Sequence, residues 1–424
     1  MDKNTTYLPR IIDTQIAEYL AASGAVLIEG PKWCGKTWAT RHIAHSVLYL
    51  QDPDKSAKYL DIAREKPSLL LEGEPPLLID EWQMAPVLWD AVRFAVDMRG
   101  KTGQFLLTGS AVPLDNAVLH TGTGRIARLT MRPMSLFESR ESSGDVSLME
   151  LFAGVEEISG RSTLTIEEFA FILSRGGWPA SVTDEKTVAL KRVKNYVDAV
   201  INYDVSRVDG VEKNPDRVRT LLQSLARNTA SMATIGTITA DVSATDGDVS
   251  EKTISKYLTA LRRIFVIEDL PAWRPALRSK TMIRSSPKRH FVDPSLAVAV
   301  LRATPERLLH DFNTFGILFE SLCVRDLRIY ASANDGAVYH YHDANDLEAD
   351  AIVQLYDGRW CAIEIKLGTS EIDAAARNLL KLKERINTEK MSSPTFLMVL
   401  TGMGEFAYRR SDGVFVVPIA CLKP

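Results

Sequence analysis

The stretch GPKWCGKT at residues 30–37 constrains the fold of this chain more than any other part of the sequence. It follows the apolar run AVLIE and precedes a segment with helical spacing, which predicts a buried strand that turns into a helix. The stretch matches the pattern G-x-x-x-x-G-K-[ST], in which glycines let backbone N–H groups curl around phosphates at a helix N-terminus. A phosphate-binding loop in this setting predicts a parallel α/β sheet.

The loop supplies the residues that we expect to surround a nucleoside triphosphate. Lys36 would bridge the β- and γ-phosphates, and Thr37 would ligate Mg²⁺. The alternative is a chance match in a strand-to-helix loop, which the length of the pattern and its flanks disfavour. The predicted nucleotide-binding residues are Gly30, Pro31, Lys32, Trp33, Cys34, Gly35, Lys36, Thr37 and Trp38.

Two further apolar runs end in polar residues. PPLLIDE ends in Asp80, expected to hold Mg²⁺ through water, and in Glu81, expected to be the base that polarises the attacking water. QFLLTGS contains Thr108 and Ser110, and we expect its strand to lie between the strands of the other two motifs. A polar side chain there can read the γ-phosphate, and the alternative is a plain turn with a serine cap.

In this order the three motifs resemble those of the additional-strand P-loop ATPases of the AAA type. A closer resemblance is to a large group of bacterial and archaeal predicted ATPases that join an AAA core to a C-terminal domain of unknown function. It is carried by GRIARLTMRPMSLFE, RGGWP, YLTALRRIFVIEDL and FVDPSLA. The resemblance implies ATP and Mg²⁺ as cofactors, and ATP hydrolysis that drives conformational change in a nucleic-acid or protein partner.

The resemblance also implies an arginine finger that reaches the nucleotide of a neighbouring subunit, and therefore a homo-oligomer. Arg125 stands where this finger would fall, with Arg128 as the less favoured choice and Arg175 as a weaker candidate for a second sensor. The alternative for Arg125 is a surface ion pair with Glu138 or Glu141.

The order of predicted elements indicates an α/β multidomain chain. We expect a P-loop AAA-type core at 1–145, a helical lid or connector at 146–212, a winged helix-turn-helix at 213–285 and a restriction-endonuclease-like α/β domain at 286–424. Lysines and arginines on the third helix of the winged region would meet DNA phosphates, although many winged helices only pack against other domains.

CAIEIKLG, residues 361–368, places a carboxylate and a lysine on one face of a predicted strand. The order Glu320, Asp350, Glu364 and Lys366 resembles the PD-(D/E)xK nucleases, which implies a second Mg²⁺ site and a lysine that orients the attacking water. Glu348 and Ala349 replace the usual proline before the aspartate, which puts cleavage in doubt. The alternative is an ion pair of Glu364 with Lys366 or a neighbour.

Composition and net charge limit which binding partners and which cellular compartment the sequence favours. A net charge of −3 gives no global attraction to nucleic acid or membrane, and no apolar run approaches the roughly 18 residues of a membrane helix. Four scattered cysteines fit a reducing cytoplasm and lack metal-ligand spacing. Three functions remain: an ATPase that remodels DNA or a protein, an ATP-dependent Mg²⁺ nuclease in genome defence, and a nucleotide-gated DNA-binding regulator.

Overall fold

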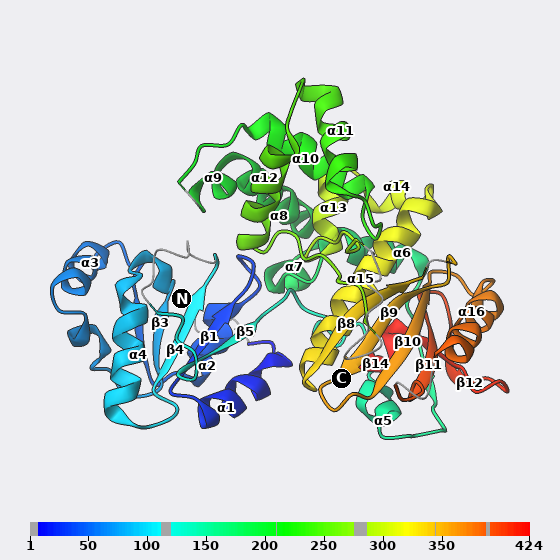
Figure 1. Cartoon of the computed structure of the whole chain (residues 1–424), viewed down its shortest axis with the longest axis horizontal. Helices are drawn as coiled ribbons and strands as arrows, with labels where there is room; N and C mark the ends of the chain where they lie inside the picture. Colours follow the sequence, from blue (N-terminus) through cyan, green and yellow to red (C-terminus); the bar gives the residue numbers. More distant parts are fainter. Residues whose placement is uncertain (1–6, 112–119, 209, 275–285, 344, 387–390) are drawn as a thin grey trace. The chain divides into compact units, whose positions relative to one another are not determined.

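The computed structural model describes residues 7–111, 120–208, 210–274, 286–343, 345–386 and 391–424 (Figure 1). The chain forms two compact units. The first comprises Met1–Pro133, Asn202–Lys213 and Thr259–Val266, and the second comprises Met134–Ile201, Asn214–Leu258 and Ile267–Pro424. Each unit is described by itself.

The first unit is built on a five-stranded parallel sheet in the order β2-β3-β4-β1-β5. The strand of FLLTGS, β4, pairs with the two motif strands, β1 and β3, so the predicted position between them is confirmed. The strands are β1 (Ala25–Glu29), β2 (Ser46–Tyr49), β3 (Leu77–Asp80), β4 (Phe105–Gly109) and β5 (Ile126–Thr130).

Helices cover both faces of this sheet, which explains why its strands are apolar runs without alternation. Val26 and Ile28 of β1 face one cluster with α1 (Ile12–Ala22) and α2 (Lys36–Ile43). Leu27, between them, faces the other cluster with α3 (Ser56–Glu65) and α4 (Val87–Arg99). Short 3₁₀ turns follow at η1 (Pro67–Leu71) and η2 (Trp82–Met84).

The middle of the chain is helical, as predicted (Figure 1). A capping box between Thr165 and Glu168 starts α6, and the GGWP stretch separates α6 from α7. The elements are α5 (Leu148–Phe152), α6 (Ile166–Arg175), α7 (Pro179–Thr183), α8 (Lys186–Ala199), η3 (Val200–Asp204), α9 (Val205–Arg207), α10 (Pro215–Arg227), α11 (Ile235–Asp246), α12 (Glu251–Arg263), α13 (Pro294–Val300) and α14 (Pro305–Leu309).

A seven-stranded mixed sheet forms the C-terminal part, in the order β7-β12-β13-β11-β10-β9-β8. The β8–β9–β10 pairs are antiparallel, whereas β10 pairs with β11 and β11 with β13 in parallel. Two helices, α15 (Phe312–Ser332) and α16 (Ile372–Arg385), pack on it. The strands are β7 (Gly160–Arg161), β8 (Gly336–His342), β9 (Glu348–Leu355), β10 (Trp360–Lys366), β11 (Phe396–Thr401), β12 (Phe406–Arg409) and β13 (Phe415–Pro418).

Several local expectations need correction. The sequence predicts that the helix after the phosphate loop starts near Trp38, but α2 begins at Lys36. It also predicts a turn at DVSATDGDVS, residues 241–250, but α11 extends through Asp246. FVIEDLPAW, predicted to be a short strand, instead forms isolated bridges, which include Ile267 with Phe291 and Leu270 with Lys288. The rest of the predicted winged region, 275–285, lies outside the described residues.

The domain boundaries at 145, 212 and 285 stay predictions. A third sheet, of two strands, joins β6 (Val146–Ser147) to β14 (Leu422–Lys423), which follows the 3₁₀ turn η4 (Ile419–Cys421). Across the described ranges, every helix is too short or too polar to cross a bilayer.

Candidate functional site

The loop between β1 and α2 requires its glycines. Gly30 has φ 153° and Gly35 has φ 103°, in the region that side chains disfavour. A Cβ on Gly30 would lie 2.1 Å from the carbonyl oxygen of Met131, just past β5, so only glycine fits there. Arg10 holds the loop from outside by donating to the carbonyl oxygens of Cys34 and Arg132, both at 2.7 Å.

Lys36 lies inside the curve of this loop. Its Nζ donates to the carbonyl oxygens of Gly30 at 2.9 Å and Pro31 at 2.7 Å, and the residue is only 5% exposed. The ammonium group therefore donates to backbone carbonyl oxygens of the same loop that the sequence predicts to bind phosphates. An incoming phosphate would compete with these two carbonyl oxygens for the same donor.

Asp80 is the centre of the polar contacts at the carboxyl end of the sheet. It is wholly buried, and its Oδ1 accepts from Thr37 Oγ1 at 2.8 Å and from Thr108 Oγ1 at 2.7 Å. Its Oδ2 accepts from Gln51 Nε2 at 2.9 Å. The three predicted residues thus meet at one carboxylate, and Gln51 joins them. Hydroxyl and carboxylate oxygens are the ligands that Mg²⁺ prefers, so this donor set fits the ion.

Glu81 follows directly and adopts the left-handed conformation, with φ 56° and ψ 49°. Its backbone N–H donates to Thr108 Oγ1 at 3.2 Å. Its carboxylate accepts from Ser110 Oγ at 2.9 Å and from the side-chain amide of Gln83. A non-glycine residue in this conformation is uncommon and clusters at functional sites. The backbone turns Glu81 away from the strand, and two donors then hold its carboxylate.

The remaining predicted loop residues divide into exposed and buried ones. Lys32 pairs with Asp204 of η3 at 2.6 Å, and Trp33 and Trp38 are exposed at 55% and 39%. Cys34 is buried, with its Sγ 3.4 Å from the carbonyl oxygen of Met131. The two tryptophans therefore offer apolar surface at the loop, whereas the thiol is part of its packing.

The predicted arginines have partners within their own unit. Arg125 Nε lies 2.8 Å from Asp97 Oδ1 on α4, so its ion pair is with a different carboxylate from Glu138 or Glu141, the partners of the alternative to a finger. The finger itself stays a prediction. Arg128 lies over the ring of Trp89 and 3.7 Å from Glu29.

Arg175, the candidate second sensor, is buried within the second unit. Its guanidinium pairs with Glu141 and donates to the carbonyl oxygen of Gly176 at 2.7 Å. These contacts give Arg175 a structural role at the end of α6.

The C-terminal acidic residues come together as predicted, but with two lysines between them. Lys366 Nζ lies 2.9 Å from Glu364 Oε2 and 3.6 Å from Asp350 Oδ2. Lys288 Nζ lies 2.8 Å from Glu320 Oε1 and 3.4 Å from Asp350 Oδ1. These five residues are the carboxylate–lysine cluster. In the described part of the chain, no group of three or more His, Cys, Asp or Glu side chains is arranged to hold a metal.

Burial dominates the electrostatics of this cluster. It raises the pKa of Glu320 to about 8 and that of Glu364 to about 7, with the charge of Asp350 adding to both effects. The pKa of Asp350 is nevertheless lowered, because Lys288, Lys366 and the backbone N–H of Ile365 stabilise its charge. Asp350 is therefore the ionised partner of both lysines, and the two glutamates hold the protons most readily.

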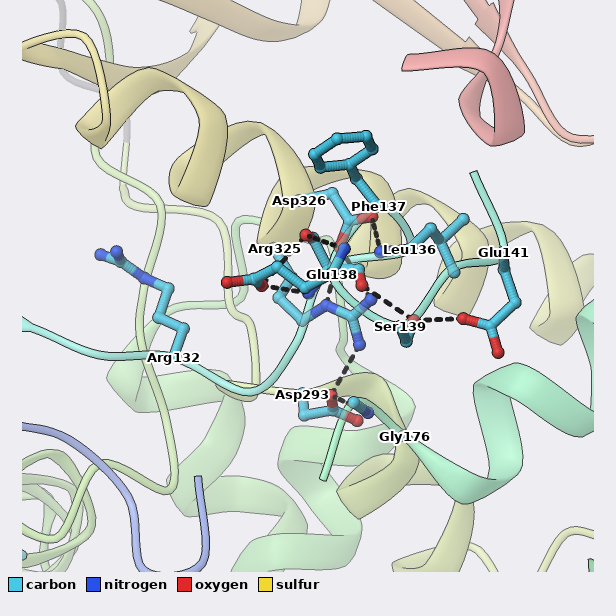
Figure 2. Close-up of polar contacts among 12 residues, drawn as sticks. Arg132, Leu136, Phe137, Glu138, Ser139, Glu141, Gly176, Asp293, Arg325 and Asp326 are labelled. Atoms are coloured by element: carbon cyan, nitrogen blue, oxygen red, sulfur yellow. Dashed lines mark hydrogen bonds and ion pairs between the residues drawn. The ribbon is translucent and has the colours of Figure 1, made fainter. Parts of the chain in front are cut away.

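A second buried network joins the segment after β5 to α15 (Figure 2). Asp326 Oδ2 accepts from the backbone N–H of Leu136 at 2.8 Å. Arg325 lies between two carboxylates, with 2.7 Å to Asp293 Oδ2 and 2.7 Å to Asp326 Oδ1. Asp293 Oδ2 also accepts from the backbone N–H of Gly177, in the GGWP stretch, at 3.0 Å. Burial raises the pKa of Asp326 to about 6 against the opposing effect of Arg325.

Comparison with known families identifies a domain in the first unit. Residues 22–139 match the AAA domain. This match covers the loop, Asp80, Glu81 and β4. An AAA domain implies nucleotide binding and ATP hydrolysis. Residues 166–307 and 315–422 match two domains of unknown function, DUF8612 and DUF4143.

Two mycobacterial proteins are similar over most of their length. The uncharacterized proteins Rv2008c of Mycobacterium tuberculosis and Mb2031c of Mycobacterium bovis are each 24% identical over 407 residues, 93% of this chain and 79% of theirs. Among solved structures, a Walker-type ATPase of Pyrococcus abyssi aligns at 14% identity over 68% of this chain and 94% of its own, with a TM-score of 0.41.

Sequence reasoning missed Gln51, Gln83, Lys288 and also Asn378, whose Nδ2 donates to Glu364 Oε1 at 2.6 Å. Gln51 follows the end of β2, the strand beside β3, and the carboxyl ends of parallel strands meet at one edge of a sheet. That rule could have found it. Gln83 lies two residues from Glu81, in a turn that the local sequence does not predict. Lys288 and Asn378 carry no local signal, because their partners are distant in sequence.

Proposed function

We propose that this protein hydrolyses ATP with Mg²⁺ at the loop and strand ends of the first unit, and uses the energy to change the conformation of a DNA or protein partner. The observation that carries the proposal is the meeting of Thr37, Thr108 and Asp80 at one buried carboxylate beside the glycine loop. Strand order, motif order and the AAA match agree with it.

The roles follow from the positions of the side chains. Lys36 binds the β- and γ-phosphates once it leaves the carbonyl oxygens of Gly30 and Pro31. Thr37 and Asp80 would hold Mg²⁺, which when bound would supply charge neutralisation at the phosphate oxygens. Glu81 takes a proton from the attacking water, and Thr108 orients the water or reads the γ-phosphate.

The contacts of Glu81 describe a resting arrangement. Gln83 and Ser110 both donate to Oε2 of its carboxylate and hold the side chain in place. Nucleotide binding would release Glu81 from these donors. Until the site is filled, the two contacts would restrain hydrolysis.

Nucleotide binding and turnover by Lys36→Ala test this proposal. Arg41→Ala is the matched control, because Arg41 is an exposed cation on α2, the helix that Lys36 begins. Lys36→Ala should lose binding of a fluorescent ATP analogue and turnover, whereas Arg41→Ala should keep most of both. Tight binding and normal turnover in Lys36→Ala would remove the phosphate role from this loop.

A nucleotide-gated DNA-binding regulator is the second candidate. The helices α10, α11 and α12 are followed by antiparallel bridges between 267–270 and 288–291, an order that suits a winged helix. Lys252 and Lys256 are exposed near the start of α12, where a helix entering a major groove would meet phosphates.

DNA binding in EDTA by wild type and by Lys252→Ala/Lys256→Ala discriminates this candidate. Weaker binding with a shallower salt dependence in the double variant supports it. Binding that is equal in both proteins, or undetectable in wild type, excludes it.

ATP turnover that rises with DNA would identify DNA as the partner, and turnover indifferent to DNA would point to a protein partner. Mass measurement with ATP tests the proposed homo-oligomer.

A further inference from the structure

A buried lysine lies between two of the carboxylates that the nuclease resemblance assigns to a metal ion. Lys288 Nζ is 2.8 Å from Glu320 Oε1 and 3.4 Å from Asp350 Oδ1, and its side chain is 8% exposed. Lys288 lies outside the sheet, next to Arg289 in the segment before FVDPSLA. The nuclease pattern requires no lysine at this place.

Three further carboxylate oxygens of the cluster are also engaged. Asp350 Oδ2 accepts from the backbone N–H of Ile365 at 2.8 Å. Glu364 Oε1 accepts from Asn378 Nδ2 at 2.6 Å, and its Oε2 lies 2.9 Å from Lys366. A hard divalent cation needs several oxygen ligands arranged around it at once. Here those oxygens already accept from the chain.

The net charge of the cluster also disfavours a bound divalent cation. Glu320, Asp350 and Glu364 carry at most three negative charges, and the ammonium groups of Lys288 and Lys366 carry two positive ones. A divalent cation added to this set would leave an excess positive charge at a buried place, where desolvation is costly. Without Lys288, a divalent cation would instead be needed to balance the carboxylates.

We infer that Lys288 is a built-in counter-ion that takes the place of a divalent cation in the carboxylate–lysine cluster. The cluster joins α15, β9 and β10 as a structural element and does not cleave phosphodiesters. Removing the ammonium converts the same carboxylates into a divalent-cation site. This inference is independent of ATP hydrolysis in the first unit.

Mn²⁺ binding to nucleotide-free protein at pH 8, measured by electron paramagnetic resonance, tests the inference. We expect wild type and Asp350→Asn to bind Mn²⁺ equally, since the wild-type cluster takes none. Lys288→Met should gain a Mn²⁺ ion that the double variant Lys288→Met/Asp350→Asn loses. Arg289→Met is the matched control, because Arg289 is equally buried and pairs with Asp269 at 2.8 Å outside the cluster.

Two results of the Mn²⁺ measurement would overturn the inference. One is Mn²⁺ binding by wild type that Asp350→Asn abolishes, and this comparison does not require any Lys288 variant to fold. The other is a folded Lys288→Met that gains no Mn²⁺. Lys288→Gln serves as a second variant with a smaller change in polarity. Cleavage of supercoiled DNA by wild type with Mn²⁺, lost in Asp350→Asn, would also refute the structural role.

Discussion

Replacing Asp326 by alanine would remove one of the two carboxylates that hold the buried guanidinium of Arg325. It would also leave the backbone N–H of Leu136 without its acceptor. Breaking a buried ion pair costs about 3–5 kcal/mol, and Asp293 still pairs with Arg325 at 2.7 Å, so the lower end applies. The orphaned N–H adds about 1 kcal/mol. We therefore expect a loss of about 4 kcal/mol in the free energy of opening this part of the second unit.

Native-state hydrogen exchange at pH 7.5 measures this loss directly, through a peptide that contains Leu136. A decrease of about 4 kcal/mol corresponds to roughly thousandfold faster exchange. Asp326→Asn keeps an oxygen for the Leu136 N–H and should lose less. Asp97→Ala is the control, because its pair with Arg125 is exposed and worth at most about 1 kcal/mol. Exchange that accelerates less than tenfold in Asp326→Ala would refute the reasoning.

Three further predictions concern single contacts. Gln83→Ala frees the carboxylate of Glu81 from a bond worth about 1.5 kcal/mol, so basal ATP turnover should rise by up to about tenfold, and a fall would make Gln83 a positioning residue instead. Burial lowers the pKa of His340 to about 4. Below pH 6.5 the unfolded chain therefore binds a proton at this histidine that the folded chain does not, and the free energy of unfolding falls. His340→Gln should therefore reduce the loss of stability between pH 6.5 and 5 by about 1.5 kcal/mol in urea titrations, and an unchanged loss would contradict this assignment. Arg125→Ala should slow turnover only at concentrations where the chain assembles, and an equal loss in a proven monomer would exclude the finger.

The parts of the fold that local sequence specifies were predictable. The glycine loop, the apolar strands and the residue that ends each strand are properties of a few neighbouring positions, and the parallel sheet then brings Asp80 and Thr108 together. The hairpin from β9 to β10 was predictable for the same reason.

Partners that arrive from distant segments were not predictable. Lys288 and Asp350 are 62 positions apart, and no spacing rule links a lysine before FVDPSLA to a strand that follows α15. The pairing of β11 and β13 beside β10 was also missed, because α16 separates β10 from β11 and β12 separates β11 from β13, and local sequence does not specify which distant strands pair. The acidic cluster was anticipated, but its counter-ion was not.

ATP turnover by Glu81→Gln tests the central claim most directly. The substitution keeps the size of the side chain and removes the base, so nucleotide affinity should stay near the wild-type value while turnover with Mg²⁺ falls by about a hundredfold or more. Glutamine at this position can still contact Ser110, which preserves the local fold. Turnover equal to that of wild type, at equal nucleotide affinity, would contradict the account and place the base elsewhere.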